Sequence, residues 1–255
     1  MKKLKIRQVA IGEGRPKVCV PLMGSSLEAV TAEAAAAASL GADLVEWRVD
    51  AFEHADNTEL AMEALGRIRT AAGDLPLIFT FRTAREGGLR DIAPETYAAL
   101  NRAAAASGHA DLIDVELFSG EDIVRDLIHT AHAAGVHTIV SSHDFDQTPP
   151  LEELISRLRR AQELGGDLPK LAVMPQSAGD VLTLLEATRV MTERYADRPI
   201  ITMSMAGLGL VSRLAGEVFG SAVTFGSAGR ASAPGQIPAA ELRALLERQH
   251  SGLQG

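Results

Sequence analysis

Short apolar runs recur along the chain with helical segments between them, and this recurrence constrains the fold more than any other feature. The runs begin at residues 17, 44, 76, 112, 137, 168, 199 and 222, so most intervals are about 30 residues, the length of a β/α unit. The intervening segments are rich in Ala, Leu, Glu and Arg and carry apolar residues at helical spacing. Eight such repeats predict an α/β fold, a (β/α)8 TIM barrel.

The segment before the first repeat and the chain length complete this prediction. Residues 4–16 alternate and turn like a hairpin, which we expect to cap the bottom of the barrel. Barrels of ~250 residues commonly fold as one unit, so we expect residues 1–255 to form a single catalytic domain. An open doubly wound sheet is disfavoured, because the first turn, "LMGSS", lacks the glycine pattern of a dinucleotide site.

Charge and composition exclude several classes of partner. The net charge of −8 argues against nucleic acid, which usually requires a basic stripe. No apolar run approaches the ~20 residues that span a bilayer, so we expect no membrane segment. Cys19 is the only cysteine and lies in a strand-like run, which fits a reducing compartment and a cytoplasmic location.

Strand alternation gathers ionisable residues on one face of the predicted sheet. Successive side chains of a strand point to opposite faces, so Glu46, Arg48 and Asp50 face away from the helices. The same alternation turns inward, on four further strands, Arg82, Asp114, Glu116, Ser141, His143 and Lys170. Most of these lie near the carboxyl ends of their strands, where barrel enzymes place catalysis.

Lys170 is the only lysine after residue 17 and lies within the apolar run "LPKLAVM". Burial and neighbouring arginines are expected to lower its pKa and leave an amine able to attack a carbonyl. His143, one strand away, can move the proton on the adjacent carbon. Arg48, Arg82 and Arg213 suggest an anionic substrate, because a guanidinium pairs with a carboxylate in bidentate fashion. These residues predict a Schiff-base lyase acting on a small oxo-acid.

Other chemistries have weaker support. A dedicated metal site is disfavoured, because His143 and Asp144 cannot both face inward and no Cys/His ligand spacing occurs. Magnesium held by Glu46, Asp114 and Glu116 stays open as an alternative. A serine hydrolase is also disfavoured, because the sequence has no Gly-x-Ser-x-Gly turn between a strand and a helix.

Several motifs, in this order and spacing, resemble the type I 3-dehydroquinate dehydratases. They are "EWRVD" at 46–50, "FTFRTAREGG" at 79–88, "SSHDF" at 141–145, "PKLAVMPQS" at 169–177, "TMSMAGLGLVSRLAGEVFGS" at 202–221 and "SAPGQ" at 232–236. The resemblance covers nearly the whole chain. It implies dehydration of 3-dehydroquinate to 3-dehydroshikimate in the shikimate pathway, by a cofactor-independent, metal-free, cytoplasmic homodimer.

The resemblance also implies a role for individual residues. Lys170 forms the Schiff base, His143 is the general acid/base, Glu86 orients His143, and Arg213 holds the substrate carboxylate. The other residues implied to bind substrate are Glu46, Arg48, Arg82, Ser232, Gln236 and the apolar Met203, Met205 and Phe225, although ordinary core packing explains those three equally well. Residues 226–238 resemble a lid that closes over the site and excludes water.

Three positions depart from the family pattern, and one alternative enzyme stays open. Pro21 stands where some members have a serine, and Gly207 and Gly229 stand where some have lysine. The alternative is another Schiff-base enzyme, an aldolase of a sugar phosphate. It needs a phosphate site near the last two strands, which Ser227, Gly229 and Arg230 could mimic.

Overall fold

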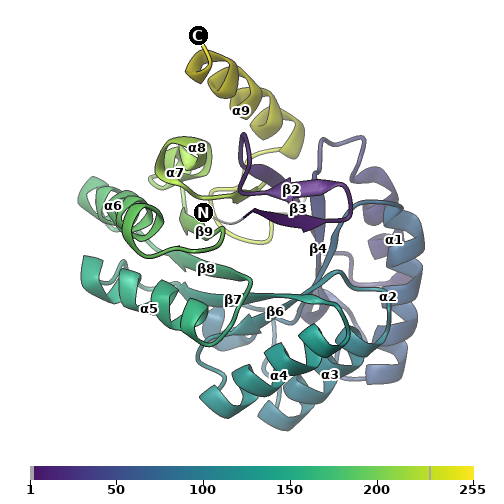
Figure 1. Ribbon diagram of the computed structural model, residues 1–255. Coiled ribbons are helices and arrows are strands. Elements are labelled where there is room, and N and C mark those ends of the chain that lie inside the picture. The colour runs from purple at the N-terminus through teal and green to yellow at the C-terminus, as the bar shows by residue number, and fades with distance from the viewer. Residues whose placement is uncertain (1–2, 230) are drawn as a thin grey trace.

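Eight parallel strands form a barrel surrounded by helices, as the repeat pattern predicted (Figure 1). The structure is a computed structural model that describes residues 3–229 and 231–255. The barrel strands are β3 Lys17–Leu22, β4 Leu44–Arg48, β5 Leu77–Thr80, β6 Leu112–Glu116, β7 His137–Asp144, β8 Leu168–Val173, β9 Ile201–Ser204 and β10 Val223–Phe225. Their spatial order is β10-β3-β4-β5-β6-β7-β8-β9, and an isolated parallel bridge between Ile200 and Ser221 joins the two ends.

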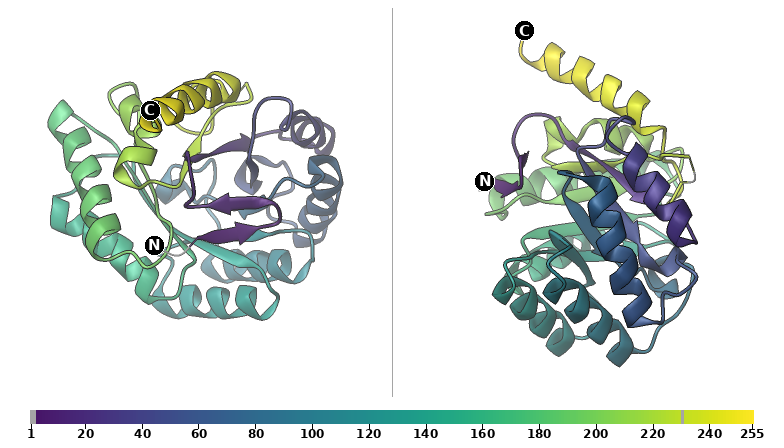
Figure 2. Two further views of the ribbon diagram at one scale, coloured as in Figure 1. Left: turned by 45° about the horizontal axis from the view of Figure 1, so that its top comes forward. Right: turned by 90° about the vertical axis from the view of Figure 1, so that its right-hand side faces the viewer.

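Helices follow the strands and cover the outside of the barrel. They are α1 Leu27–Ala36, α2 Thr58–Ala72, α3 Pro94–Ala106, α4 Glu121–Ala133, α5 Leu151–Glu163, α6 Ala178–Arg194, α7 Leu210–Leu214, α8 Gly216–Phe219 and α9 Ala239–Leu253. Two short 3-10 helices, η1 Val49–Ala51 and η2 Ala84–Glu86, follow β4 and β5. The C-terminal part of α9 projects away from the body of the molecule (Figure 2).

The predicted hairpin is present and lies across one end of the barrel (Figure 1). Its strands, β1 Leu4–Ile6 and β2 Val9–Ile11, pair in antiparallel fashion. Ile6 and Ile11 are buried in one apolar cluster with residues from the beginnings of the barrel strands, including Leu44, Leu112 and Leu168. The hairpin therefore covers the N-terminal end of the barrel and leaves the opposite end for the site.

The barrel interior changes from apolar to polar along each strand. On β8, Leu168 lies in the apolar layer and Lys170 lies two residues further on, on the same face. On β7, Ile139 lies in the apolar layer, and Ser141 lies two residues further on, on the same face. The outward residues of the strands, such as Trp47 on β4, pack in a separate core beneath the helices. The polar side chains therefore converge above the apolar layer, toward the carboxyl ends of the strands.

Candidate active site

One cavity at the carboxyl ends of the strands is lined by most of the residues that the sequence singled out. From that set, its lining contains Glu46, Arg48, Arg82, Glu86, His143, Lys170, Met203, Met205, Phe225, Ser232 and Gln236. Of the residues that the family resemblance implies to act in catalysis or substrate binding, Arg213 alone is absent from this lining; its Nη1 lies 3.8 Å from the sulfur of Met203, which is part of the lining. The lining also contains Gly87, Phe145, Ala172 and Ala233, which the sequence did not single out. Alternation from Lys170 could have identified Ala172, whereas the other three lie in loops.

Lys170 lies at the centre of this group and is 5% exposed. Its Nζ donates hydrogen bonds to Oε1 of Glu46 at 3.3 Å and to Oδ2 of Asp114 at 3.2 Å. It also lies 4.7 Å from the centre of the Phe225 ring. We expected arginines around this amine, but the structure places two carboxylates against it. They offset the cost of burying its charge, and both are within reach to accept a proton from it.

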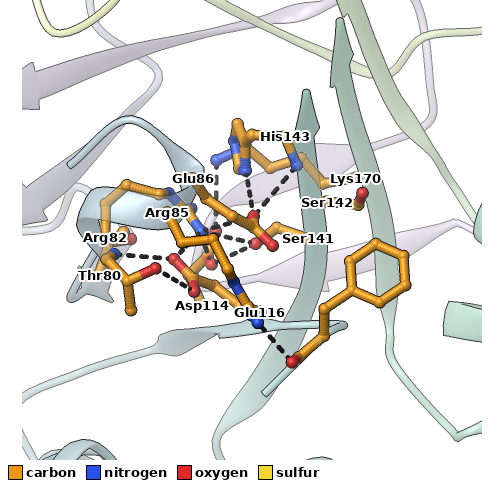
Figure 3. A network of polar contacts seen from close by, with 12 residues as sticks. Thr80, Arg82, Arg85, Glu86, Asp114, Glu116, Ser141, Ser142, His143 and Lys170 are labelled. Atoms are coloured by element: carbon orange, nitrogen blue, oxygen red, sulfur yellow. Dashed lines mark hydrogen bonds and ion pairs between the residues drawn. The ribbon is translucent and has the colours of Figure 1, made fainter. Parts of the chain in front are cut away.

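His143 forms a close pair with the buried Glu86 (Figure 3). Oε2 of Glu86 lies 2.9 Å from Nδ1 of His143 and accepts a hydrogen bond from the backbone N–H of His143 at 3.1 Å. Burial, followed by the positive charges of Arg82, Lys170 and Arg48, lowers the pKa of His143 well below its ordinary value. Burial raises the pKa of Glu86 to about 8. The surroundings therefore favour the neutral forms of both groups, and Nε2 is the ring nitrogen of His143 that Glu86 does not engage.

Arg82 connects the carboxylates beneath the cavity (Figure 3). Its guanidinium lies 2.9 Å from Oδ1 of Asp114 and 3.0 Å from Oε1 of Glu116, and it donates to Oγ of Ser141 at 2.9 Å. We had expected Arg82 on the strand, but β5 ends at Thr80 and Arg82 is the second residue of the following loop. Its side chain nevertheless points inward. Asp114 and Glu116, which the alternation predicted on the inner face, thus have Arg82 as their ion-pair partner.

Asp50 holds Arg48 in place. The sequence predicted that Asp50 lies on the same face as Arg48, but it gave Asp50 no role. Its Nε and Nη2 donate to the two oxygens of Asp50 at 2.8 and 2.7 Å. Asp50 lies in η1 and also accepts hydrogen bonds from the backbone N–H groups of Arg82 and Leu89. Asp50 thus fixes the position of Arg48. It also holds both ends of the loop that carries Glu86, at Arg82 and at Leu89.

Arg213 is a buried cation without a carboxylate partner among the described residues. It is 1% exposed, its Nε has no hydrogen-bond partner, and Nη2 donates to the carbonyl oxygen of Pro234 at 3.1 Å. Burial lowers its pKa to about 10. Because an unpaired buried charge is costly, Arg213 is suited to receive an anionic group beside the Met203 wall of the cavity.

The loop between β10 and α9 contacts the site from above. Gln236 accepts a hydrogen bond from the backbone N–H of Ser232 at 3.0 Å, and its Nε2 donates to Oγ of Ser232 at 2.9 Å. The Ser232 carbonyl oxygen lies 3.3 Å from Nη1 of Arg48. These contacts place Ser232 and Gln236, which belong to the segment that we expected to act as a lid, at the cavity. Arg230, part of the alternative phosphate site, lies outside the described residues.

Across residues 3–229 and 231–255, no group of three His, Cys, Asp or Glu side chains is arranged to hold a metal ion. Glu46 and Asp114 bind Lys170, and Glu116 binds Arg82. Over the same residues, no helix has the length and apolar character needed to cross a bilayer.

A lysine, a histidine and several arginines at the carboxyl ends of barrel strands define the class of protein: an enzyme of the β/α-barrel type. Comparison with known proteins defines it further. The model of the type I 3-dehydroquinase family matches residues 18–252. The chain belongs to this family.

Several relatives support this membership. A 3-dehydroquinate dehydratase of Bacillus licheniformis is 57% identical, with 99% of this chain and 100% of the relative covered. One of Salmonella agona is 54% identical, with 98% and 99% covered. The solved type I enzyme of Clostridium difficile, described with covalently modified comenic acid, has a TM-score of 0.96 and 49% identity, with 98% and 99% covered.

More distant structures share only the architecture. A 3-hexulose-6-phosphate synthase superimposes with a TM-score of 0.61 at 18% identity, covering 90% of this chain and 99% of that one. This likeness shows the fold alone and gives no support to the sugar-phosphate alternative.

Proposed function

We propose that the chain dehydrates 3-dehydroquinate to 3-dehydroshikimate through an imine at Lys170. The observation that carries the proposal is the placement of Lys170 and His143 on neighbouring strands, on one cavity wall. Ser141 pairs with Lys170 in the register of β7 and β8, so His143 lies two residues further along the same face. The names of the family members that match over their full length support the choice of substrate.

Lys170 and His143 together can carry out the steps of this reaction. Lys170 gives one proton to a neighbouring carboxylate and its amine attacks the substrate carbonyl, and the carbonyl oxygen leaves as water when the imine forms. The protonated imine draws electrons from the adjacent carbon, so His143 can remove a proton there. The same histidine protonates the departing hydroxyl, and water then hydrolyses the imine to release the product and Lys170.

The remaining residues bind and orient the substrate. Arg213, Arg48 and Arg82 supply the cations for a carboxylate and hydroxyl groups, and Glu46, Ser232 and Gln236 supply further polar contacts. Met203, Met205 and Phe225 form the apolar wall. In this proposal Glu86 orients His143. The reaction uses no cofactor and no metal ion.

We further propose that residues 1–255 act as one catalytic domain, in a cytoplasmic homodimer of the shikimate pathway. The family match over residues 18–252 and the coverage of whole relatives support the single domain.

Product formation tests the reaction. The purified chain should convert 3-dehydroquinate to a conjugated enone, followed by its ultraviolet absorbance. His143→Ala should lower the rate about 10²–10⁴-fold, because it removes the acid/base group, while imine formation persists. Tight binding of 3-dehydroquinate without product in the wild type, or full turnover by His143→Ala, would contradict the proposal.

A further inference from the structure

The two carboxylates that contact Lys170 occupy different positions. Glu46, whose Oε1 lies 3.3 Å from Nζ, is part of the cavity lining. Asp114, whose Oδ2 lies 3.2 Å from Nζ, is 0% exposed and is not part of that lining. A substrate in the cavity therefore meets Glu46 directly, whereas Asp114 lies behind the lysine and keeps its contact.

Asp114 is also fixed by its other neighbours. Its Oδ1 accepts a hydrogen bond from Oγ of Ser141 at 2.6 Å and lies 2.9 Å from Nη2 of Arg82. Burial alone would raise the pKa of Asp114, but Arg82, Lys170 and the Ser141 hydroxyl together hold it below its ordinary value. The carboxylate is therefore charged, and Oδ2 is left facing Nζ of Lys170 (Figure 3).

The chemistry at Lys170 requires such a charge throughout the reaction. An ammonium and a ketone give a protonated imine and one water, so the single positive charge on nitrogen is conserved. Loss of one proton from the ammonium frees the nitrogen lone pair that forms the C–N bond. The carbonyl oxygen then leaves as water with two protons, both of which began on the ammonium. A positive charge buried at this depth is costly unless a negative group stays beside it.

From this arrangement we infer that Asp114 is the counter-ion that keeps the Lys170 imine protonated while the neighbouring carbon loses its proton. The inference rests on the proposed imine mechanism and assigns a catalytic role to a residue behind the cavity. Glu46 has a different role, since its contact with Nζ is exchanged for contacts with the substrate.

Trapping with cyanoborohydride tests the inference, because this reagent reduces protonated imines. The full chain is mixed with saturating 3-dehydroquinate between pH 6 and 9, and the mass added to the Lys170 peptide is followed with time. In Asp114→Asn, trapping should decline at a pH lower by at least about one unit than in the wild type, which corresponds to about tenfold in the protonation equilibrium. Turnover should decline over the same range.

Glu46→Gln is the matched control, since it removes a carboxylate at nearly the same distance from Nζ. It should raise the concentration of 3-dehydroquinate that half-saturates trapping, and its pH dependence should stay within about half a unit of the wild type. An unchanged pH dependence in Asp114→Asn, or an equal shift in Glu46→Gln, would overturn the inference. No mass on Lys170 in the wild type would instead overturn the proposed function.

A second measurement needs no variant, so it tests the protonated imine that the inference requires even if Asp114→Asn does not fold. The wild type is saturated with 3-dehydroshikimate at pH 9, and the C=N stretching frequency is recorded by Raman spectroscopy in H2O and in D2O. A protonated imine carries an exchangeable proton, so the frequency should shift in D2O. An imine band that does not shift would overturn the inference.

Discussion

Glu86 has a carboxyl group whose environment opposes its charge. It is buried against His143, and its Oε1 has no hydrogen-bond partner. Burial raises its pKa to about 8 from an ordinary value of 4.5. A group with a raised pKa in the folded state stabilises the protein fully below the unfolded value, and this contribution is lost as the pH rises through the folded value.

Replacing Glu86 should therefore change how stability depends on pH. The free energy of unfolding of the wild type, relative to Glu86→Gln, should fall by more than about 1 kcal/mol between pH 5 and pH 9. Urea unfolding at both pH values measures this. Glu63→Gln, at an exposed position of α2, controls for the loss of a carboxyl group as such. An equal difference between wild type and Glu86→Gln at the two pH values would show that burial does not oppose the charge.

Alternation predicted which side chains turn inward, but it did not predict their partners. Asp114, Ser141 and Lys170 were placed on the interior face, and the structure brings them together. Which of them touch depends on the stagger of neighbouring strands, which a single sequence does not reveal. For the same reason, the sequence did not reveal that carboxylates make the direct contacts with Lys170: Arg82 lines the same cavity, but its guanidinium is turned toward the carboxylates beside it.

The loop between β5 and α3 positions Glu86. Two glycines allow the close packing that this loop requires. Gly87 has φ 83°, and a Cβ there would lie 2.2 Å from the Phe145 ring. Gly88 is packed against the carbonyl oxygen of Arg82. Glu116 secures the loop by accepting hydrogen bonds from the backbone N–H of Thr83 at 2.9 Å and from its hydroxyl at 2.8 Å.

Gly87→Ala should consequently damage the site. Its Cβ would push η2 or Phe145 aside and move Glu86 from His143, so we expect kcat to fall by about tenfold or more. Steady-state kinetics measures this. Gly108→Ala is the control, because Gly108 has φ 71° and a Cβ there would have nothing within 4 Å. Both variants should lose about 1–2 kcal/mol of stability from backbone strain. Wild-type kcat in Gly87→Ala would refute the positioning role of this loop.

The sequence predicted the strands and main helices better than the connections. The 3-10 helices η1 and η2 were not predicted, because three-residue turns leave no periodic pattern. The positions of Glu86, Ser232 and Gln236 came from the family resemblance alone, since loop side chains follow no alternation.

For the whole molecule, the prediction of a barrel with a capping hairpin is confirmed. The eight barrel strands begin within two residues of the predicted positions, because each is a short apolar run bounded by a helix. The apolar layer at the hairpin end and the polar layer above it follow from the same alternation. Assembly into a homodimer stays a prediction.

The central claim is that Lys170 forms a covalent imine with the substrate, and borohydride reduction tests it most directly. Borohydride added to the wild type during turnover of 3-dehydroquinate should fix the ligand mass to the peptide that contains Lys170. Lys170→Ala should gain no mass and form no product. The other lysines all lie at or before residue 17, so peptide mapping separates them from Lys170 without ambiguity. Mass on one of those lysines, or no mass during active turnover, would contradict the account.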